Sequence, residues 1–150
     1  MAGAVVLPST GMAPRQALVA VSAVQLAAGV AGQVIALRRR HPYDTPLMGG
    51  RPEHVGRDSF LSGTALSAPV VMLAAQAWAI GRLRARPADG ARRALGGLGD
   101  TMVAGYLAQR LCRRRLTPGG LDPVETPVVV VGLLGAAAMG VLGHRDQAGR

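Results

Sequence analysis

The stretch VETPVVVVGLLGAAAMGVLG, residues 124–143, decides the fold. After Glu125 it has no charged side chain, and it lacks the polar face that a helix on a soluble protein presents to water. A helix rises about 1.5 Å per residue, so about 20 residues cross a hydrocarbon layer of about 30 Å. We therefore predict that this stretch is a membrane-spanning helix.

Three further apolar stretches of similar length precede it, and arginines flank each of them. They cover residues 16–37, 60–81 and 94–112. The pattern predicts an all-α fold, an integral membrane four-helix transmembrane bundle, because a soluble bundle of this size would need polar helix faces. The first stretch is too long for the apolar region of a signal peptide and is predicted to be retained.

This division predicts a single transmembrane domain over residues 16–143, a flexible lead over 1–15 and a short polar tail over 144–150. Consecutive spans alternate in direction, so the connections over 38–59 and 113–123 should share one membrane face. Both termini and the connection between the second and third spans should then lie on the other face.

Small residues recur every fourth position on three of the predicted spans. Such stripes let helix backbones approach closely in lipid, either within one chain or between copies of it. The low aromatic content, 3%, agrees with cores built from small and aliphatic side chains. The stripes are Ala28, Gly32 and Ala36; Gly97, Thr101 and Gly105; and Gly132, Ala136 and Gly140.

All 17 basic side chains are arginine, and the formal net charge is +9. The arginines gather at the ends of the apolar stretches and are not interleaved with aromatic residues, so nucleic acid is not predicted as a partner. They are placed to meet the anionic headgroups of a lipid bilayer. Arginine without lysine, together with abundant Ala, Gly and Val, is typical of GC-rich bacterial genomes. We therefore expect a multi-pass protein of the bacterial cytoplasmic membrane, with 38–59 and 113–123 on the cytoplasmic side.

Two of the predicted spans carry features that disturb a regular helix. Pro69 cannot donate a hydrogen bond, so a kink is expected in the second span. The third span contains Asp100, Gln109 and Arg110, and the alternative for it is an amphipathic helix that lies at the membrane surface. Cys112 is the only cysteine, and the arginines after it could lower the pKa of its thiol.

Polar residues on apolar helices supply the first candidate site. Gln25, Gln76 and Asp100 fall at similar depth in the same half of the membrane. We therefore predict an intramembrane polar cluster in which hydrogen bonds offset the cost of burying Asp100. A proton relay or a cation site is the functional interpretation, and a neutral or hydrogen-bonded aspartate that fixes helix packing is the structural one.

Two further groups lie at the opposite membrane face. Arg110 ends the third span where Glu125 opens the fourth, which predicts an interfacial ion pair. The first connection supplies a candidate loop site that has no spacing typical of a metal or catalytic motif, so no metal, cofactor or catalytic residue is predicted. Its residues are His41, Asp44, Glu53, His54 and Asp58.

These patterns favour a non-enzymatic subunit or accessory helical bundle, which associates with itself as a homo-oligomer or with a larger membrane complex. The alternative is a membrane enzyme or carrier for a lipophilic or cationic small molecule that uses the first loop or Asp100. Whether the protein is an enzyme stays open at this stage.

Overall fold

The computed structural model describes residues 12–145, and this part of the chain is all-α. Within it, β pairing is confined to two isolated bridges, Asp44 with Gly49 and Thr64 with Ser67. The helices are α1 (Met12–Arg39), α2 (Val55–Leu61), α3 (Val70–Ala85), α4 (Asp89–Ala108), α5 (Arg110–Arg115) and α6 (Glu125–His144), with the short 3₁₀ turns η1 (Pro52–His54) and η2 (Pro118–Gly120).

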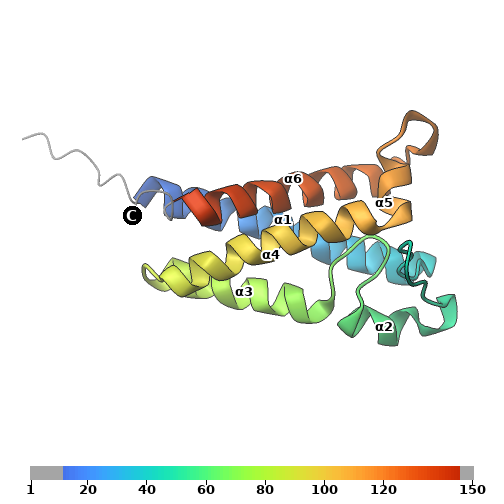
Figure 1. Cartoon of the computed structure of the whole chain (residues 1–150), viewed down its shortest axis with the longest axis horizontal. Coiled ribbons are helices and arrows are strands. Elements are labelled where there is room, and N and C mark those ends of the chain that lie inside the picture. Colours follow the sequence, from blue (N-terminus) through green and yellow to red (C-terminus); the bar gives the residue numbers. More distant parts are fainter. Residues whose placement is uncertain (1–11, 146–150) are drawn as a thin grey trace, which may run out of the picture.

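The four long helices α1, α3, α4 and α6 pack in a ring. Helix α1 contacts α3 and α6, and α4 contacts the same two helices from the other side. The first and third connections meet at one end, which we call the Glu125 end, and the turn between α3 and α4 lies at the other end (Figure 1). The start of α1 and the end of α6 lie at that other end too.

The second predicted span is not one kinked helix over 60–81. Helix α2 ends at Leu61, and α3 begins only after Pro69, so residues 62–69 are not helical. Pro69 disfavours helical dihedral angles in the residue before it. Gly63 has a φ of 80°, which lies outside the right-handed helical region, so a helix cannot run through this segment. Residues 63–67 are buried, which lets irregular backbone exist beside α1.

The third predicted span, 94–112, is also divided. Helix α4 runs over Asp89–Ala108, and Gln109 has a ψ of 123° before α5 begins. The amide of Arg110 donates to the carbonyl oxygen of Asp44 at 2.9 Å, and the amide of Asp44 donates to Oε1 of Gln109 at 2.8 Å. The amide of Arg110 thus binds the first connection in place of a carbonyl one turn earlier in the helix, whereas the amide of Gln109 still donates to the carbonyl oxygen of Gly105.

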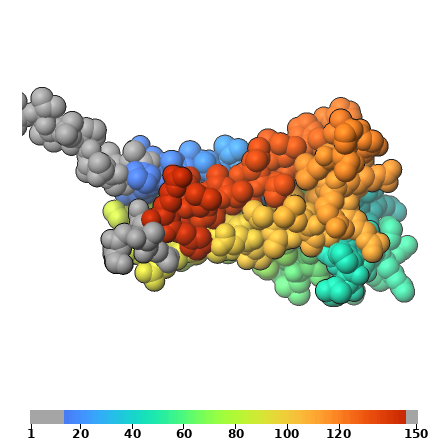
Figure 2. All heavy atoms as spheres, turned by 45° about the horizontal axis from the view of Figure 1, so that its top comes forward, coloured from blue at the N-terminus to red at the C-terminus, as the bar shows by residue number. Residues whose placement is uncertain are grey.

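The closest helix contact joins α4 to α6 through glycine. A Cβ added to Gly99 would lie 2.6 Å from the carbonyl oxygen of Ala136, and one added to Gly143 would lie 2.5 Å from Cα of Gly96. Figure 2 shows the two helices side by side along one face of the molecule. Such contacts are typical of helices that pack backbone against backbone.

The predicted stripes on the first and last spans are confirmed as buried faces. Ala36 and Ala136 are fully buried, and Gly32 and Gly140 are buried with them. The stripe predicted on α4 does not pack within the chain, because Gly97, Thr101 and Gly105 are exposed. Contact of this stripe with another copy of the chain stays a prediction. The face of α4 that contains Gly96 and Gly99 packs against α6 instead.

Among the described residues, two helices are long and apolar enough to cross a membrane by length and composition. They are Pro14–Arg39 within α1 and Glu125–His144, which is α6. Helix α3 has 16 residues, which rise about 24 Å, and the segment 62–69 continues its path toward the Glu125 end. Residues 12–15 of the predicted lead belong to α1. The rest of the lead and residues 146–150 of the tail lie outside the described residues.

Candidate functional site

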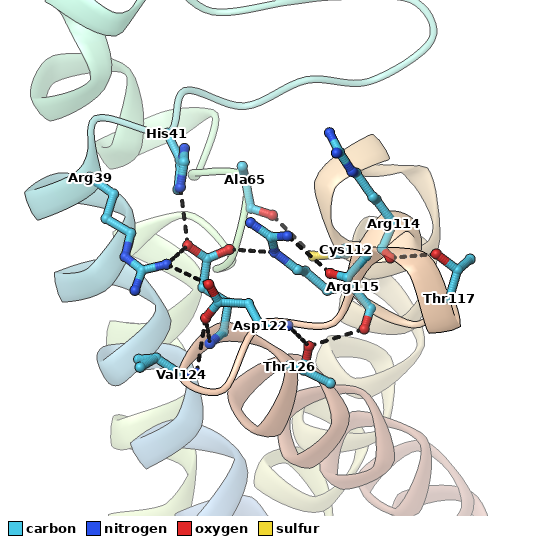
Figure 3. A network of polar contacts seen from close by, with 12 residues as sticks. Arg39, His41, Ala65, Cys112, Arg114, Arg115, Thr117, Asp122, Val124 and Thr126 are labelled. Atoms are coloured by element: carbon cyan, nitrogen blue, oxygen red, sulfur yellow. Dashed lines mark hydrogen bonds and ion pairs between the residues drawn. The ribbon is translucent and has the colours of Figure 1, made fainter.

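The centre of the Glu125 end is a fully buried carboxylate on the first residue of α6. Oε2 of Glu125 accepts a hydrogen bond from Nε of Arg115 at 2.8 Å, and Oε1 lies 3.1 Å from Nε2 of His41. Nη1 of Arg39 donates to both Glu125 and Asp122 (Figure 3). We call these five residues, Arg39, His41, Arg115, Asp122 and Glu125, the Glu125 cluster.

Asp122 opens α6 by capping it. Its Oδ1 accepts hydrogen bonds from the amides of Val124 at 2.9 Å and Glu125 at 2.8 Å. These two bonds, followed by the bond from Arg39, lower the pKa of the Asp122 carboxyl to about 2. The carboxylate therefore stays charged at neutral pH and stabilises the helix start, where the backbone amides lack helical partners.

The cluster connects segments that are far apart in the sequence. Arg39 ends α1, His41 lies in the first connection and Arg115 ends α5. Arg115 also donates from Nη1 to the carbonyl oxygen of Gly120 at 2.9 Å, and Thr126 donates to the carbonyl oxygen of Arg115 at 3.1 Å. Two arginines and two carboxylates balance in charge, so the arrangement holds three helix ends together without a net buried charge.

The predicted ion pair between Arg110 and Glu125 is wrong. Nε of Arg110 lies 3.8 Å from Oδ1 of Asp44, and Glu125 is occupied by Arg39 and Arg115. The cause is the break at Gln109, which redirects the chain so that Arg115 faces Glu125. In the sequence, nothing distinguishes Arg115 from the two arginines before it in the triplet Arg113–Arg115.

The candidate loop site is dispersed in the structure. His41 belongs to the Glu125 cluster, whereas Asp44 contacts Gln109 and Arg110. Glu53 and His54 are exposed in η1, and Asp58 lies 3.6 Å from Nε of its neighbour Arg57. Among the described residues, no three His, Cys, Asp or Glu side chains gather as a metal site.

Cys112 lies inside the Glu125 end and not among the arginines that follow it. Its Sγ lies 3.0 Å from the carbonyl oxygen of Ala65, and the side chain is buried. Burial, and then the charge of Glu125, raise the pKa of the thiol to about 12. The possible lowering of this pKa by Arg113–Arg115 is therefore not seen, because burial disfavours the charged thiolate.

The structure brings two members of the predicted polar cluster together. Nε2 of Gln76 donates to Oε1 of Gln25 at 2.7 Å and to the carbonyl oxygen of Ser22 at 2.8 Å. Both glutamines are fully buried between α1 and α3. Such bonds between apolar helices fix their rotation and depth relative to one another.

Asp100 is not part of that cluster. Its carboxylate lies 2.8 Å from Nε2 of His144, and its side chain is 62% exposed. Gly99 faces α6, so the next residue along α4 falls at the edge of the contact, where it reaches the last residue of α6. His144 had no predicted role, and its place at the end of the fourth span is the only signal of the pair in the sequence.

Comparison of the chain with protein-family models, with curated proteins and with solved structures finds no match.

Proposed function

We propose that the chain is a multi-pass protein of the bacterial cytoplasmic membrane, in which α1, α3, α4 and α6 all cross the bilayer. In this proposal it is a non-enzymatic subunit or accessory bundle that associates with itself or with a larger membrane complex. The single observation that carries the proposal is the exposure of large apolar side chains along α1, α3 and α6 around buried glutamines. Helix α4, on which Asp100 is 62% exposed, is included because it packs against α3 and α6.

Large apolar side chains are exposed on α1, α3 and α6, whereas two glutamines are buried in a core that also contains Leu18 and Met139. Trp78 and Leu134 are 61% and 65% exposed, while Gln25 and Gln76 are fully buried. A soluble protein buries large apolar residues and leaves glutamine at the surface. Hydrocarbon around the helices favours the opposite placement, because polar groups cost free energy in lipid.

The end of α3 supports the same location. Trp78 is exposed, and the guanidinium carbon of Arg82 lies 5.8 Å from the centre of its ring. Tryptophan and arginine gather where hydrocarbon meets headgroups, since the ring is apolar and the charge remains hydrated. The pair is placed to mark one boundary of the bilayer on α3.

The Glu125 cluster favours a structural role over catalysis. His41 and Glu125, which are side chains of the kind used in acid–base chemistry, are held by partners from several helix ends. The buried stripes of α1 and α6 are occupied within the chain, so association with another chain falls to the exposed apolar faces. The outer face of α6 is one of these, with Val131, Leu134 and Val141 exposed.

An arginine in the middle of α6 tests the membrane location. Leu134→Arg should lower the free energy of unfolding in lipid bicelles by about 3 kcal/mol, the cost of a charge at the centre of a spanning helix. Leu121→Arg is the matched control, because Leu121 is 63% exposed but lies before α6 at the Glu125 end. That control should change stability by less than about 0.5 kcal/mol.

Equal, small effects of the two arginines would contradict the membrane proposal, since a solvent-exposed leucine on a soluble protein tolerates either change. Association is tested separately by the protein mass of particles solubilised in mild detergent. The proposal predicts more than one chain, or a co-purifying membrane protein, in each particle. A bare monomer under conditions that preserve the fold would contradict the subunit role.

A further inference from the structure

Gly105 on α4 has no packing reason to be glycine. A Cβ added there meets no atom within 4 Å, in contrast to the crowded Gly99 on the same helix. Glycine inside a helix lowers the stability of the helix relative to alanine. At Gly105 no close contact offsets this loss, and the glycine instead leaves space beside the helix. That space is a cavity of about 240 Å³.

The cavity lies between the chain around residues 62–72 and the last part of α4 together with the start of α5. The non-helical segment 62–69 forms one wall and α4 forms the other. Its lining combines apolar side chains such as Met72 and Met102 with polar ones such as Thr101 and Gln109. Seven residues separate Met102 from Gln109, so the wall that α4 supplies is about 10 Å long.

A buried hydroxyl in the wall lacks a partner. Thr64 lines the cavity and is fully buried, and its Oγ1 has no hydrogen-bond partner among the described residues. An unpaired buried hydroxyl is costly, so a molecule that supplies an acceptor beside it gains affinity. The ester carbonyl of a lipid is such an acceptor.

Two arginines follow residues that line the cavity, at the Glu125 end of the bundle. Cys112 lines the cavity, and the exposed Arg113 follows it in α5. The amide of Arg113 donates to the carbonyl oxygen of Gln109 at 3.2 Å, which places Arg113 one helical turn after a residue that lines the cavity. Arg110, whose side chain is 60% exposed, lies between them in the sequence.

We propose that this cavity binds one acyl chain of an anionic phospholipid, with the lipid phosphate on Arg110 and Arg113. The apolar side chains of the lining fit the acyl chain, the Thr64 hydroxyl fits the ester carbonyl, and the arginines fit the phosphate. A phospholipid bound in this way stands in the bilayer with its headgroup at the Glu125 end. The proposal rests on the membrane location proposed above.

The test fills the cavity from Gly105. The full chain is placed in nanodiscs with equal amounts of dioleoylphosphatidylglycerol and dioleoylphosphatidylcholine, and retained lipid is counted by native mass spectrometry. Gly105→Leu occupies the cavity, whereas Gly97→Leu is the matched control on the same helix face, where an added Cβ also meets no atom within 4 Å.

The wild-type chain and Gly97→Leu should each retain one phosphatidylglycerol. Gly105→Leu should lower its affinity by about tenfold or more, because the acyl chain loses its buried apolar surface. Arg113→Gln should keep the acyl chain and lower the preference for phosphatidylglycerol by about fivefold. Added oleate should not displace the phospholipid, since it lacks the phosphate and the second chain.

Equal retention by Gly105→Leu and Gly97→Leu would overturn the proposal, as would an unchanged lipid preference in Arg113→Gln. If Gly105→Leu does not fold, Thr64→Val decides, because it removes the hydroxyl at nearly constant volume and should lower retention severalfold. The two proposals fail separately. If lipid retention is unchanged but Leu134→Arg destabilises the chain and Leu121→Arg does not, the cavity proposal is wrong and the membrane location stands. A chain that is stable to both arginines would instead refute the membrane location itself.

Discussion

Glu125→Gln should lower the free energy of unfolding by about 3 kcal/mol, because it leaves Arg39 and Arg115 without the carboxylate they share. The Arg115 side chain is only 18% exposed, so water cannot fully replace its lost partner. The loss of the negative charge from the first turn of α6 adds to the effect, since a negative charge there interacts favourably with the helix dipole. The measurement is chemical unfolding in detergent, followed by circular dichroism.

The control is Glu53→Gln, which removes the same charge from an exposed site in η1 and should change stability by less than about 0.5 kcal/mol. A double mutant with Arg115→Gln sharpens the test. The two changes should be less destabilising together than the sum of their single effects, because each removes the same contact. Simple additivity, or a stable Glu125→Gln, would show that the Glu125 cluster does not hold the helix ends.

Gly99→Ala should destabilise the bundle by about 2 kcal/mol, since the new methyl group meets backbone atoms of α6 that cannot rotate away. The nearest of these are the carbonyl oxygen of Ala136 and the amide nitrogen of Gly140, both 2.6 Å from the added carbon. The helices α4 and α6 must separate to admit it, and their contact is the most extensive in the bundle.

Gly97→Ala on the same helix gives the opposite expectation. An added Cβ there meets no atom within 4 Å, so helix propensity should leave stability unchanged or raise it by up to ~1 kcal/mol. Thermal unfolding of both variants in one detergent provides the comparison. Equal effects of the two alanines would show that α4 does not pack on α6 through Gly99.

Hydropathy and depth predicted much of this architecture because both depend on local sequence. Apolar runs located α1 and α6 within a few residues, and equal depth paired Gln25 with Gln76. The stripe predicted on α4 does not face a neighbouring helix, because α4 is rotated about its axis relative to the prediction. Glycines occur at both 96 and 97, and the sequence does not say which of the two faces a neighbour. One step of 100° around the helix also separates Asp100 from the predicted cluster.

The Glu125 cluster depended on contacts that no local pattern contains. At the break after α4 the chain binds Asp44, which lies more than sixty residues earlier. Asp44 accepts a hydrogen bond from the amide of Arg110 and donates one to the side chain of Gln109. That break selects Arg115 from its triplet as the partner of Glu125. The sequence predicted that Pro69 disturbs the helix. It did not predict that the segment before Pro69 is buried, because this burial depends on the close approach of Leu66 to Gly32 on α1.

The most direct test of the account is the side of the membrane on which three engineered cysteines react. In a Cys112→Ala background, single cysteines replace Gly49, Gly90 and Gly119, where an added Cβ meets no atom within 4 Å. If α3 and α4 both cross the bilayer with α1 and α6, a membrane-impermeant maleimide should label Gly49→Cys and Gly119→Cys from one side and Gly90→Cys only from the other. Labelling of Gly90→Cys and Gly119→Cys from the same side would contradict the four-span bundle.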